Sequence, residues 1–130
     1  MDRIINIDGR EVKFRATART PRLYRMLIGR DMITDMNKLS KSFAKVEKAS
    51  KDATEEEQEE ARLTAIDLQI FEDTAYIMAR HADPEMEYKT ADEWLDTFDM
   101  FSIYDILPQL LDLWALNNVT TSSPKKNTIR

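Results

Sequence analysis

Five arginines stand between residues 14 and 31 of a chain whose formal net charge is −5, so this segment is the first place to look for binding chemistry. The five are Arg15, Arg19, Arg22, Arg25 and Arg30. Guanidinium groups could contact nucleic-acid phosphates, but nucleic-acid-binding surfaces usually carry aromatic side chains among their basic residues. Tyr24 is the only aromatic residue between Arg15 and Arg30.

The charged residues are distributed unevenly along the sequence. Residues 1–30 carry eight Lys/Arg and three Asp/Glu (net +5), residues 31–54 carry five and four (net +1), and residues 55–130 carry six and seventeen (net −11). We call residues 55–130 the acidic body. Its negative charge repels phosphate, whereas it attracts a basic segment of the same chain or of a neighbouring copy. We therefore favour pairing of the arginines with the acidic body or with an acidic protein partner, and keep a nucleic-acid-binding regulator as the alternative.

Two pairs of carboxylates could suggest a divalent-metal enzyme. Glu57-x-x-Glu60 and Glu93-x-x-Asp96 are loosely similar to the carboxylate pairs of all-helical nucleotide pyrophosphatases, which would make the chain a nucleotide hydrolase. Such a site needs carboxylates that face inward, where they hold Mg²⁺. Residues 55–60 contain no apolar side chain, which is typical of a solvated helix start. The sequence therefore favours a helix start over a metal site at these residues.

No other motif indicates catalysis. The single histidine, His81, follows Arg80 at a predicted helix C-terminus, where the helix dipole favours cations, so we expect a cap or surface residue. The chain has two glycines and no cysteine, which excludes a glycine-rich phosphate loop, a disulfide scaffold and a thiolate metal site. We expect no catalytic residue, no metal site and no cofactor. Without an apolar leader or membrane span, we also expect a cytosolic protein that does not bind a membrane.

The elements that position these residues are mostly helical. Two β-prone runs flank Asp8-Gly9, which predicts an antiparallel hairpin over residues 3–16. Thr20-Pro21 predicts the N-cap and first residue of a helix that Gly29 ends, with Arg22 and Arg25 on one side. Its other side is apolar and contains Leu23, Met26 and Leu27.

Longer helices follow. One begins near Asp31 and carries an apolar stripe at Met32, Met36, Leu39, Phe43 and Val46. A second is predicted from the capping box Thr54-x-x-Glu57 to about residue 82, where Asp83-Pro84 ends it. Its stripe is Leu63, Ile66, Ile70 and Ile77. The short connection predicts that these two helices pair antiparallel, with the second at the centre of the fold.

The remaining elements complete one domain. Capping boxes at Thr90 and Ser102 open helices over 91–101 and from 103 onward, and Pro108 either starts or kinks the last one. We predict an α+β, predominantly α-helical fold, in which an N-terminal β-hairpin packs on a bundle of four to five helices that includes a long antiparallel pair. The predicted domain spans residues 1–116, and the polar residues 117–130 form a disordered tail.

Residues 93–114 contain more apolar and aromatic area than two short helices need to bury. Part of it must close the core, and part is a candidate anchor patch for a protein partner, because Trp and Tyr are enriched at interface hot spots. The seven methionines add adaptable apolar surface. Together with the basic helix, the candidate protein-binding residues are Arg19, Arg22, Arg25, Trp94, Phe98, Tyr104, Leu110, Leu113 and Trp114.

Several segments together resemble a known family. The chain reads "INIDGREVKFRAT", "ARTPRLYRMLIGRDMITDMNKL", "FEDTAYIMARHA" and "EWLDTFDMFSIYDILPQLLDLW". In these it is similar to the tail assembly chaperones of long-tailed phages and prophages of Gram-positive bacteria. The resemblance covers about residues 4–116.

The resemblance implies a non-enzymatic role in viral tail assembly. Such chaperones act in the host bacterial cytoplasm, bind the tape measure protein, help recruit tail tube subunits and are absent from the mature virion. The family supplies no established binding residues to carry over. Apolar, adaptable surface suits a long helical client. The opposite charges of the N-terminal and C-terminal parts predict self-association that would coat the client with several copies.

Overall fold

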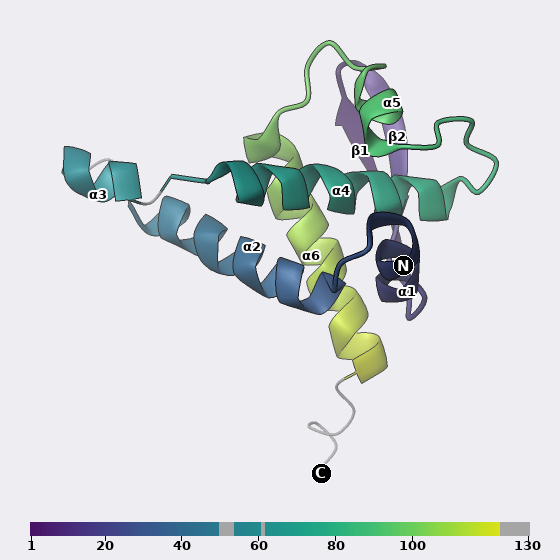
Figure 1. Cartoon of the computed structure of the whole chain (residues 1–130), viewed down its shortest axis with the longest axis horizontal. Helices are drawn as coiled ribbons and strands as arrows, with labels where there is room; N and C mark the ends of the chain where they lie inside the picture. Colours follow the sequence, from purple (N-terminus) through teal and green to yellow (C-terminus); the bar gives the residue numbers. More distant parts are fainter. Residues whose placement is uncertain (50–53, 61, 123–130) are drawn as a thin grey trace.

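A computed structural model describes residues 1–49, 54–60 and 62–122 of the chain. Within these ranges it is predominantly helical with an N-terminal two-stranded antiparallel sheet, which confirms the predicted α+β class. Figure 1 shows α4 crossing the middle of the fold, with the hairpin beside one end of it and α2 beside the other. The elements are β1 (Asp2–Ile7), β2 (Arg10–Arg15), α1 (Thr20–Ile28), α2 (Met32–Lys48), α3 (Glu55–Glu60), α4 (Ala65–Ala82), α5 (Ala91–Leu95) and α6 (Ile103–Ser122).

The hairpin turns at Asp8-Gly9, as predicted. Both residues have positive φ, 55° and 77°, which is the backbone conformation that a type I′ turn requires. Ile7 pairs with Arg10, and the register continues to Asp2 opposite Arg15. One face of the hairpin is exposed, including Ile4, and the other is buried because β2 packs on α4 and β1 packs on α6. This burial supplies the support that an isolated two-stranded ribbon lacks.

Helix α1 ends at the predicted glycine but does not begin with the predicted cap. Gly29 has φ 87°, and its N–H donates to Tyr24 O and Arg25 O at 3.3 and 3.0 Å. The N-cap residue is Arg19, without a side-chain cap, whereas the Thr20 hydroxyl accepts a hydrogen bond from Thr17 N at 2.8 Å. The prediction of Thr20 as the cap was wrong because its hydroxyl closes the preceding turn.

Replacing Gly29 with alanine is expected to lower the free energy of unfolding by about 1–2 kcal/mol, because an L-residue is strained in the left-handed region. A Cβ at this position would meet no atom within 4 Å, so the cost comes from the backbone alone. Urea unfolding followed by circular dichroism measures it. Gly29→Asn should cost less than Gly29→Ala, because asparagine tolerates this conformation, and equal losses would contradict the explanation.

Helices α2 and α4 form the predicted antiparallel pair. The Thr74 hydroxyl donates to Met36 Sδ at 3.5 Å, and farther along α2 the Ser42 hydroxyl donates to Asp67 Oδ1 at 3.1 Å. The order of these contacts reverses between the two helices, and Figure 1 shows the pair side by side. The Asp31 carboxylate caps α2. Four of the five predicted stripe residues of α2 are buried: Met32, Met36, Leu39 and Phe43.

The helix predicted from Thr54 to residue 82 is two helices. The capping box at Thr54 starts α3 as expected, with Thr54 N donating to Glu57 Oε1 at 2.9 Å. A second capping box then starts α4: Thr64 N donates to Asp67 Oδ2 at 2.9 Å, and Asp67 N donates to Thr64 Oγ1 at 3.1 Å. Because α4 begins here, Ile66 lies in its first turn and is 59% exposed, so the buried stripe begins at Ile70.

Helix α4 is central, as predicted. Its middle section is buried on nearly all sides, and it contacts β2, α1, α2, α5 and α6. It ends at Ala82, where Asp83-Pro84 was expected to stop it. The buried residues of this section are Ile70, Phe71, Thr74, Ala75, Tyr76, Ile77, Met78 and Ala79.

The last helices differ from their predicted bounds. Helix α5 spans only five residues rather than 91–101. Helix α6 begins at Ile103, contains Pro108 within it, and continues to Ser122, six residues past the predicted end of the domain at 116. Asn117 explains part of the extension, because it is buried and its side-chain amide donates to Thr17 O at 3.3 Å. Residues 123–130 of the predicted tail lie outside the described residues.

Candidate protein-binding surface

Two of the five clustered arginines form ion pairs within the described chain, and only Arg30 pairs with a residue of the acidic body, Asp73, as predicted. Arg15 Nε and Nη2 donate to the two carboxylate oxygens of Asp2 at 2.8 and 3.1 Å, and this hydrogen bonding lowers the pKa of Asp2. Arg30 Nε lies 2.9 Å from Asp35 Oδ2, and its Nη2 lies 2.8 Å from Asp73 Oδ2. These two arginines therefore stabilise the fold through ion pairs.

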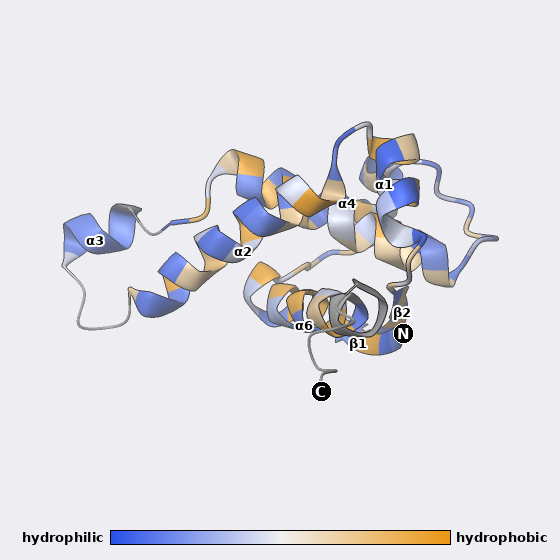
Figure 2. Ribbon diagram, turned by 90° about the horizontal axis from the view of Figure 1, so that it is seen from below, coloured by the Kyte–Doolittle hydropathy of each residue, from blue (hydrophilic) through white to orange (hydrophobic). Residues whose placement is uncertain are grey.

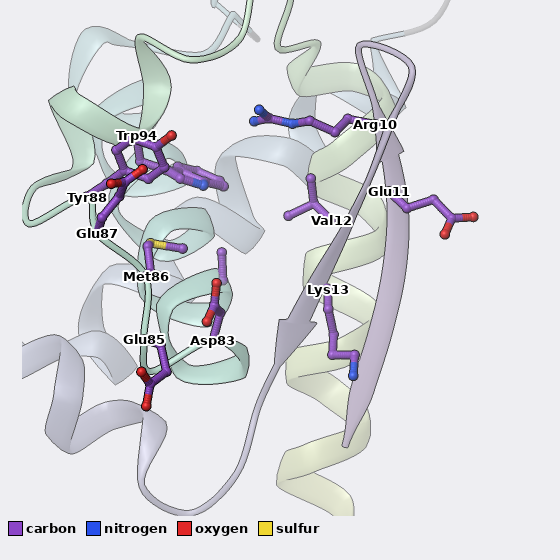
Figure 3. Close-up of a pocket in the computed structure, with 11 residues that line it drawn as sticks. Arg10, Glu11, Val12, Lys13, Asp83, Glu85, Met86, Glu87, Tyr88 and Trp94 are labelled. Atoms are coloured by element: carbon purple, nitrogen blue, oxygen red, sulfur yellow. The ribbon is translucent and has the colours of Figure 1, made fainter.

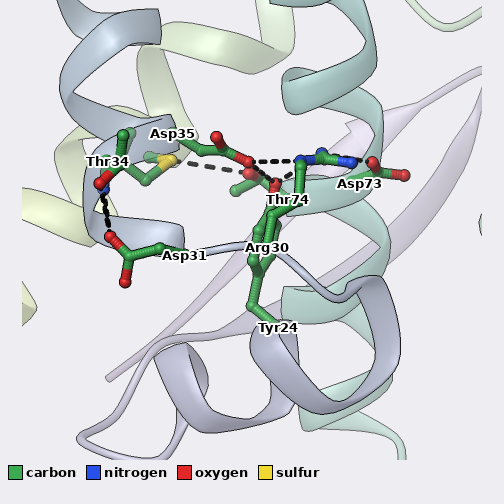
Figure 4. A network of polar contacts seen from close by, with 8 residues as sticks. Tyr24, Arg30, Asp31, Thr34, Asp35, Asp73 and Thr74 are labelled. Atoms are coloured by element: carbon green, nitrogen blue, oxygen red, sulfur yellow. Dashed lines mark hydrogen bonds and ion pairs between the residues drawn. The ribbon is translucent and has the colours of Figure 1, made fainter.

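The Arg30 contacts extend to Tyr24 (Figure 4). The Tyr24 hydroxyl donates to Asp35 Oδ2 at 2.6 Å and accepts from Arg30 Nη2 at 3.0 Å. Burial raises the pKa of Tyr24, and the bond to Asp35 adds to the rise. Burial alone would lower the pKa of Arg30, but its bonds to Asp73 and Asp35 outweigh it, so the net shift is upward. The network joins α1, the start of α2 and α4, and so fixes the orientation of α1.

The other three arginines are exposed on α1. Among the residues that the structure describes, no carboxylate lies within 4 Å of the guanidinium group of Arg19, Arg22 or Arg25. The apolar side chain of Met26 lies on the same side of the helix and is 62% exposed. We call Arg19, Arg22, Arg25 and Met26 the α1 face. This face combines three guanidinium groups that form no ion pair with a described residue and the adaptable apolar side chain of a methionine.

The composition of the α1 face corrects one prediction. Leu23, Met26 and Leu27 were expected to form the apolar side opposite Arg22 and Arg25, yet Met26 and Leu27 are exposed and only Leu23 packs partly against the core. The residues of α1 that are buried are Thr20 and Tyr24. Tyr24 faces inward because its hydroxyl joins the Arg30 network, which leaves Met26 on the turn that carries the arginines.

Most of the predicted aromatic and leucine anchors belong to the core. The buried residues of this set are Trp94, Phe98, Leu110, Leu113 and Trp114. Buried side chains offer a partner almost no surface in the folded chain, so we no longer assign these five to a docking surface. Only Tyr104, which is 61% exposed, remains available to a partner.

The hairpin accounts for the excess aromatic area. The Trp94 ring packs on Phe14 of β2 and on Tyr76 of α4, with ring centroids 6.3 and 6.0 Å apart. Phe98 and Phe101 approach the same indole ring at 5.1 and 5.5 Å. A two-stranded ribbon has little apolar area of its own, so α5 and the segment after it supply the side chains that bury it.

Two of the four carboxylates considered for metal binding accept hydrogen bonds at helix starts. Glu57 Oε1 accepts from Thr54 N, and Glu93 Oε1 accepts from Lys89 N at 2.8 Å. Across residues 1–49, 54–60 and 62–122, no group of three or more His, Asp or Glu side chains is placed to hold a metal ion. Glu57 and Glu93 therefore have structural roles at helix starts, and Asp96 is the C-cap residue of α5. Figure 2 shows α3, which carries Glu57, as a hydrophilic helix.

His81 lies at the C-terminal end of α4, as predicted, where its Nε2 is 2.8 Å from Thr17 Oγ1. Burial lowers its pKa, and Arg15 and Arg19 lower it further, while Asp2 opposes them. The folded state thus binds this proton less readily than the unfolded state. Stability should fall as the pH drops through 6.5, the ordinary pKa of histidine, toward the lower folded-state value.

Urea unfolding between pH 7.5 and 5 measures this loss of stability. The His81→Gln variant should lack the loss of stability that comes from protonation of the imidazole. It should keep the loss at lower pH that comes from protonation of carboxylates. If His81→Gln loses stability with the same pH profile as the parent chain, the assignment to His81 is wrong.

Comparisons with known proteins add no family assignment. A scan against protein-family models, a search of curated proteins and a search of solved structures each found no match to this chain. Separately, none of the helices in the described part of the chain has the length and apolar character needed to cross a membrane. The function proposed below therefore depends on the surface chemistry and on the resemblance of the sequence.

Proposed function

We propose that this chain is a non-enzymatic tail assembly chaperone of a long-tailed phage or prophage. In this role it binds the tape measure protein and helps recruit tail tube subunits. It acts in the host bacterial cytoplasm and is absent from the mature virion. The resemblance of residues 4–116 to such chaperones supports the proposal.

The observation that carries the proposal is the α1 face. Three exposed arginines surround Met26, and the Arg30 network holds the helix that bears them. Arginine is enriched at interface hot spots, and methionine adapts to differently shaped apolar partners. Such a surface suits an amphipathic helix with acidic residues beside its apolar stripe, and a long helical client presents many such stripes.

Self-association is part of the same proposal. The basic N-terminal part of one copy, residues 1–30 with a net charge of +5, and the acidic body of another, residues 55–130 with a net charge of −11, would attract each other. Copies that associate in this way would line a long client. Light scattering at increasing salt tests this point: association that weakens with salt supports it, and a monomer at every salt concentration contradicts it.

Co-expression with the tape measure protein of the same phage tests the proposal. We expect the client to remain soluble and to co-purify with this chain, and to precipitate when it is expressed alone. A client that is insoluble in both cases, or soluble without binding this chain, would refute the chaperone function.

A nucleic-acid-binding regulator is the second candidate. The observation that favours it is that Arg19, Arg22 and Arg25 are exposed and form no ion pair with any described residue. Phosphate contacts release counterions, so binding to DNA or RNA would weaken steeply with salt. Fluorescence anisotropy with labelled duplex DNA and single-stranded RNA distinguishes the regulator from the chaperone. The chaperone proposal expects no binding at physiological salt.

A further inference from the structure

An open groove of about 530 Å³ lies between β2 and the loop over residues 83–88 (Figure 3). Its volume falls in the range of ligand-binding clefts, about 300–1,000 Å³. Val12 lines it from the strand, Met86 from the loop and Trp94 from α5, which gives the groove apolar surface. The chaperone proposal makes no use of this groove.

The strand that forms one wall has an unpaired edge. Met1 N donates to Ala16 O at 2.8 Å, and Ala16 N donates to Met1 O at 2.9 Å, so this pair exchanges both hydrogen bonds. Hydrogen-bonded pairs recur at every second residue of an antiparallel ladder. The N–H and C=O groups of Glu11 and Lys13 therefore point away from β1. Within the described chain the sheet has no strand besides β1 and β2, and both residues are exposed.

The opposite wall is acidic and held in place. The Tyr76 hydroxyl donates to Tyr88 O at 2.6 Å, and Arg80 Nη1 donates to the same oxygen at 3.1 Å. Asp83, Glu85 and Glu87 alternate along the exposed part of this loop, and they form no ion pair with any residue that the structure describes.

The charges around the groove favour a basic occupant. Three carboxylates on the loop and two cations on the strand line it, Asp83, Glu85, Glu87, Arg10 and Lys13, whereas the Glu11 carboxylate points away from the loop (Figure 3). Arg10 is already engaged, because its guanidinium lies 4.0 Å from the centre of the Phe98 ring and donates to Thr97 Oγ1 at 2.8 Å. The loop wall that faces the free strand edge carries three carboxylates, and none of them forms an ion pair with a described residue.

We propose that the groove binds an extended, basic segment of a partner protein, which adds to the free edge of β2 as a third strand. The segment's backbone pairs with Glu11 and Lys13. Side chains alternate along a strand, so apolar residues of the segment contact Val12 and Met86 while intervening lysines or arginines reach the acidic loop. The site is separate from the α1 face, and the proposal does not depend on the chaperone function.

Nuclear magnetic resonance of the full chain with a blocked hexapeptide that alternates lysine and valine tests the proposal. The amide signals of Glu11 and Lys13 should shift and exchange more slowly with solvent, and the Met86 methyl signal should shift. A hexapeptide that alternates glutamate and valine should bind at least about tenfold more weakly. Unchanged edge amides at millimolar peptide, or equal binding of the two peptides, would overturn the proposal.

Variants separate the contributions of charge and backbone. Glu85→Lys with Glu87→Lys should weaken binding of the basic peptide about tenfold, and Glu56→Lys with Glu59→Lys on α3 is the charge-matched control that should not. Lys13→Pro removes an outward N–H without breaking the pairing with β1, so binding should also weaken. If the edge amides of the free chain are already protected in proportion to its concentration, the occupant is a second copy and the proposal is wrong.

Discussion

Replacing Trp94 with alanine is expected to lower the free energy of unfolding by about 3–5 kcal/mol, the largest stability effect we predict for a single substitution. The side chain is 3% exposed and contacts aromatic rings from β2, α4 and the segment that precedes α6. Its removal leaves a cavity that the rigid neighbours fill only in part. Because the same ring covers Phe14, the hairpin should lose its packing together with α5.

Urea unfolding followed by circular dichroism measures the loss, and the hairpin amides should exchange faster with solvent in the variant. Tyr104→Ala is the control, because this side chain is 61% exposed and its removal should change stability by less than about 0.5 kcal/mol. If Trp94→Ala unfolds at the same urea concentration as the parent chain, the aromatic cluster does not support the hairpin.

The second large effect concerns binding. The double variant Arg22→Glu, Arg25→Glu should weaken binding of the tape measure protein at least about tenfold, because it places negative charge where the client is expected to carry its own. Both side chains are exposed and form no ion pair among the described residues, so the fold should be retained. Titration calorimetry with a soluble client fragment measures the affinity.

Lys41→Glu with Lys45→Glu on α2 is the matched control, since both lysines are exposed and the change in net charge is the same. This control should bind the client with nearly the parental affinity. Equal weakening by the two double variants would mean that the client responds to net charge alone, and unchanged affinity in both would remove the α1 face from the binding surface.

Local signals predicted much of the fold. The turn at Asp8-Gly9, the end of α1 at Gly29 and the cap at Thr54 each depend on residues only a few positions apart, and all three are present. The same kind of signal also explains one error. Thr64-x-x-Asp67 is a capping box that lies inside an apparently continuous helical pattern, and it divides that pattern into α3 and α4.

The roles of individual site residues depended on contacts that local patterns do not encode. Arg30 reaches Asp73, which is 43 positions away, and so separates from the other arginines of its cluster. Trp94 is buried because the hairpin, 80 residues earlier at Phe14, covers it. The sequence pattern predicted a basic helix and a surplus of aromatic area correctly, but only the packing determines which arginines and which rings remain exposed.

The methyl signals of the methionines test the central claim most directly. Among them, Met26 marks the α1 face, Met86 lines the groove beside β2, and Met100 is exposed elsewhere and serves as the internal control. A carbon-13 methyl spectrum of the full chain, recorded with and without a soluble fragment of the tape measure protein, reports on all three at once. We predict that the Met26 signal shifts or broadens while the Met100 signal is unchanged. A shift at Met100 without one at Met26, or no shift at any methionine, would contradict the claim that the α1 face binds the client.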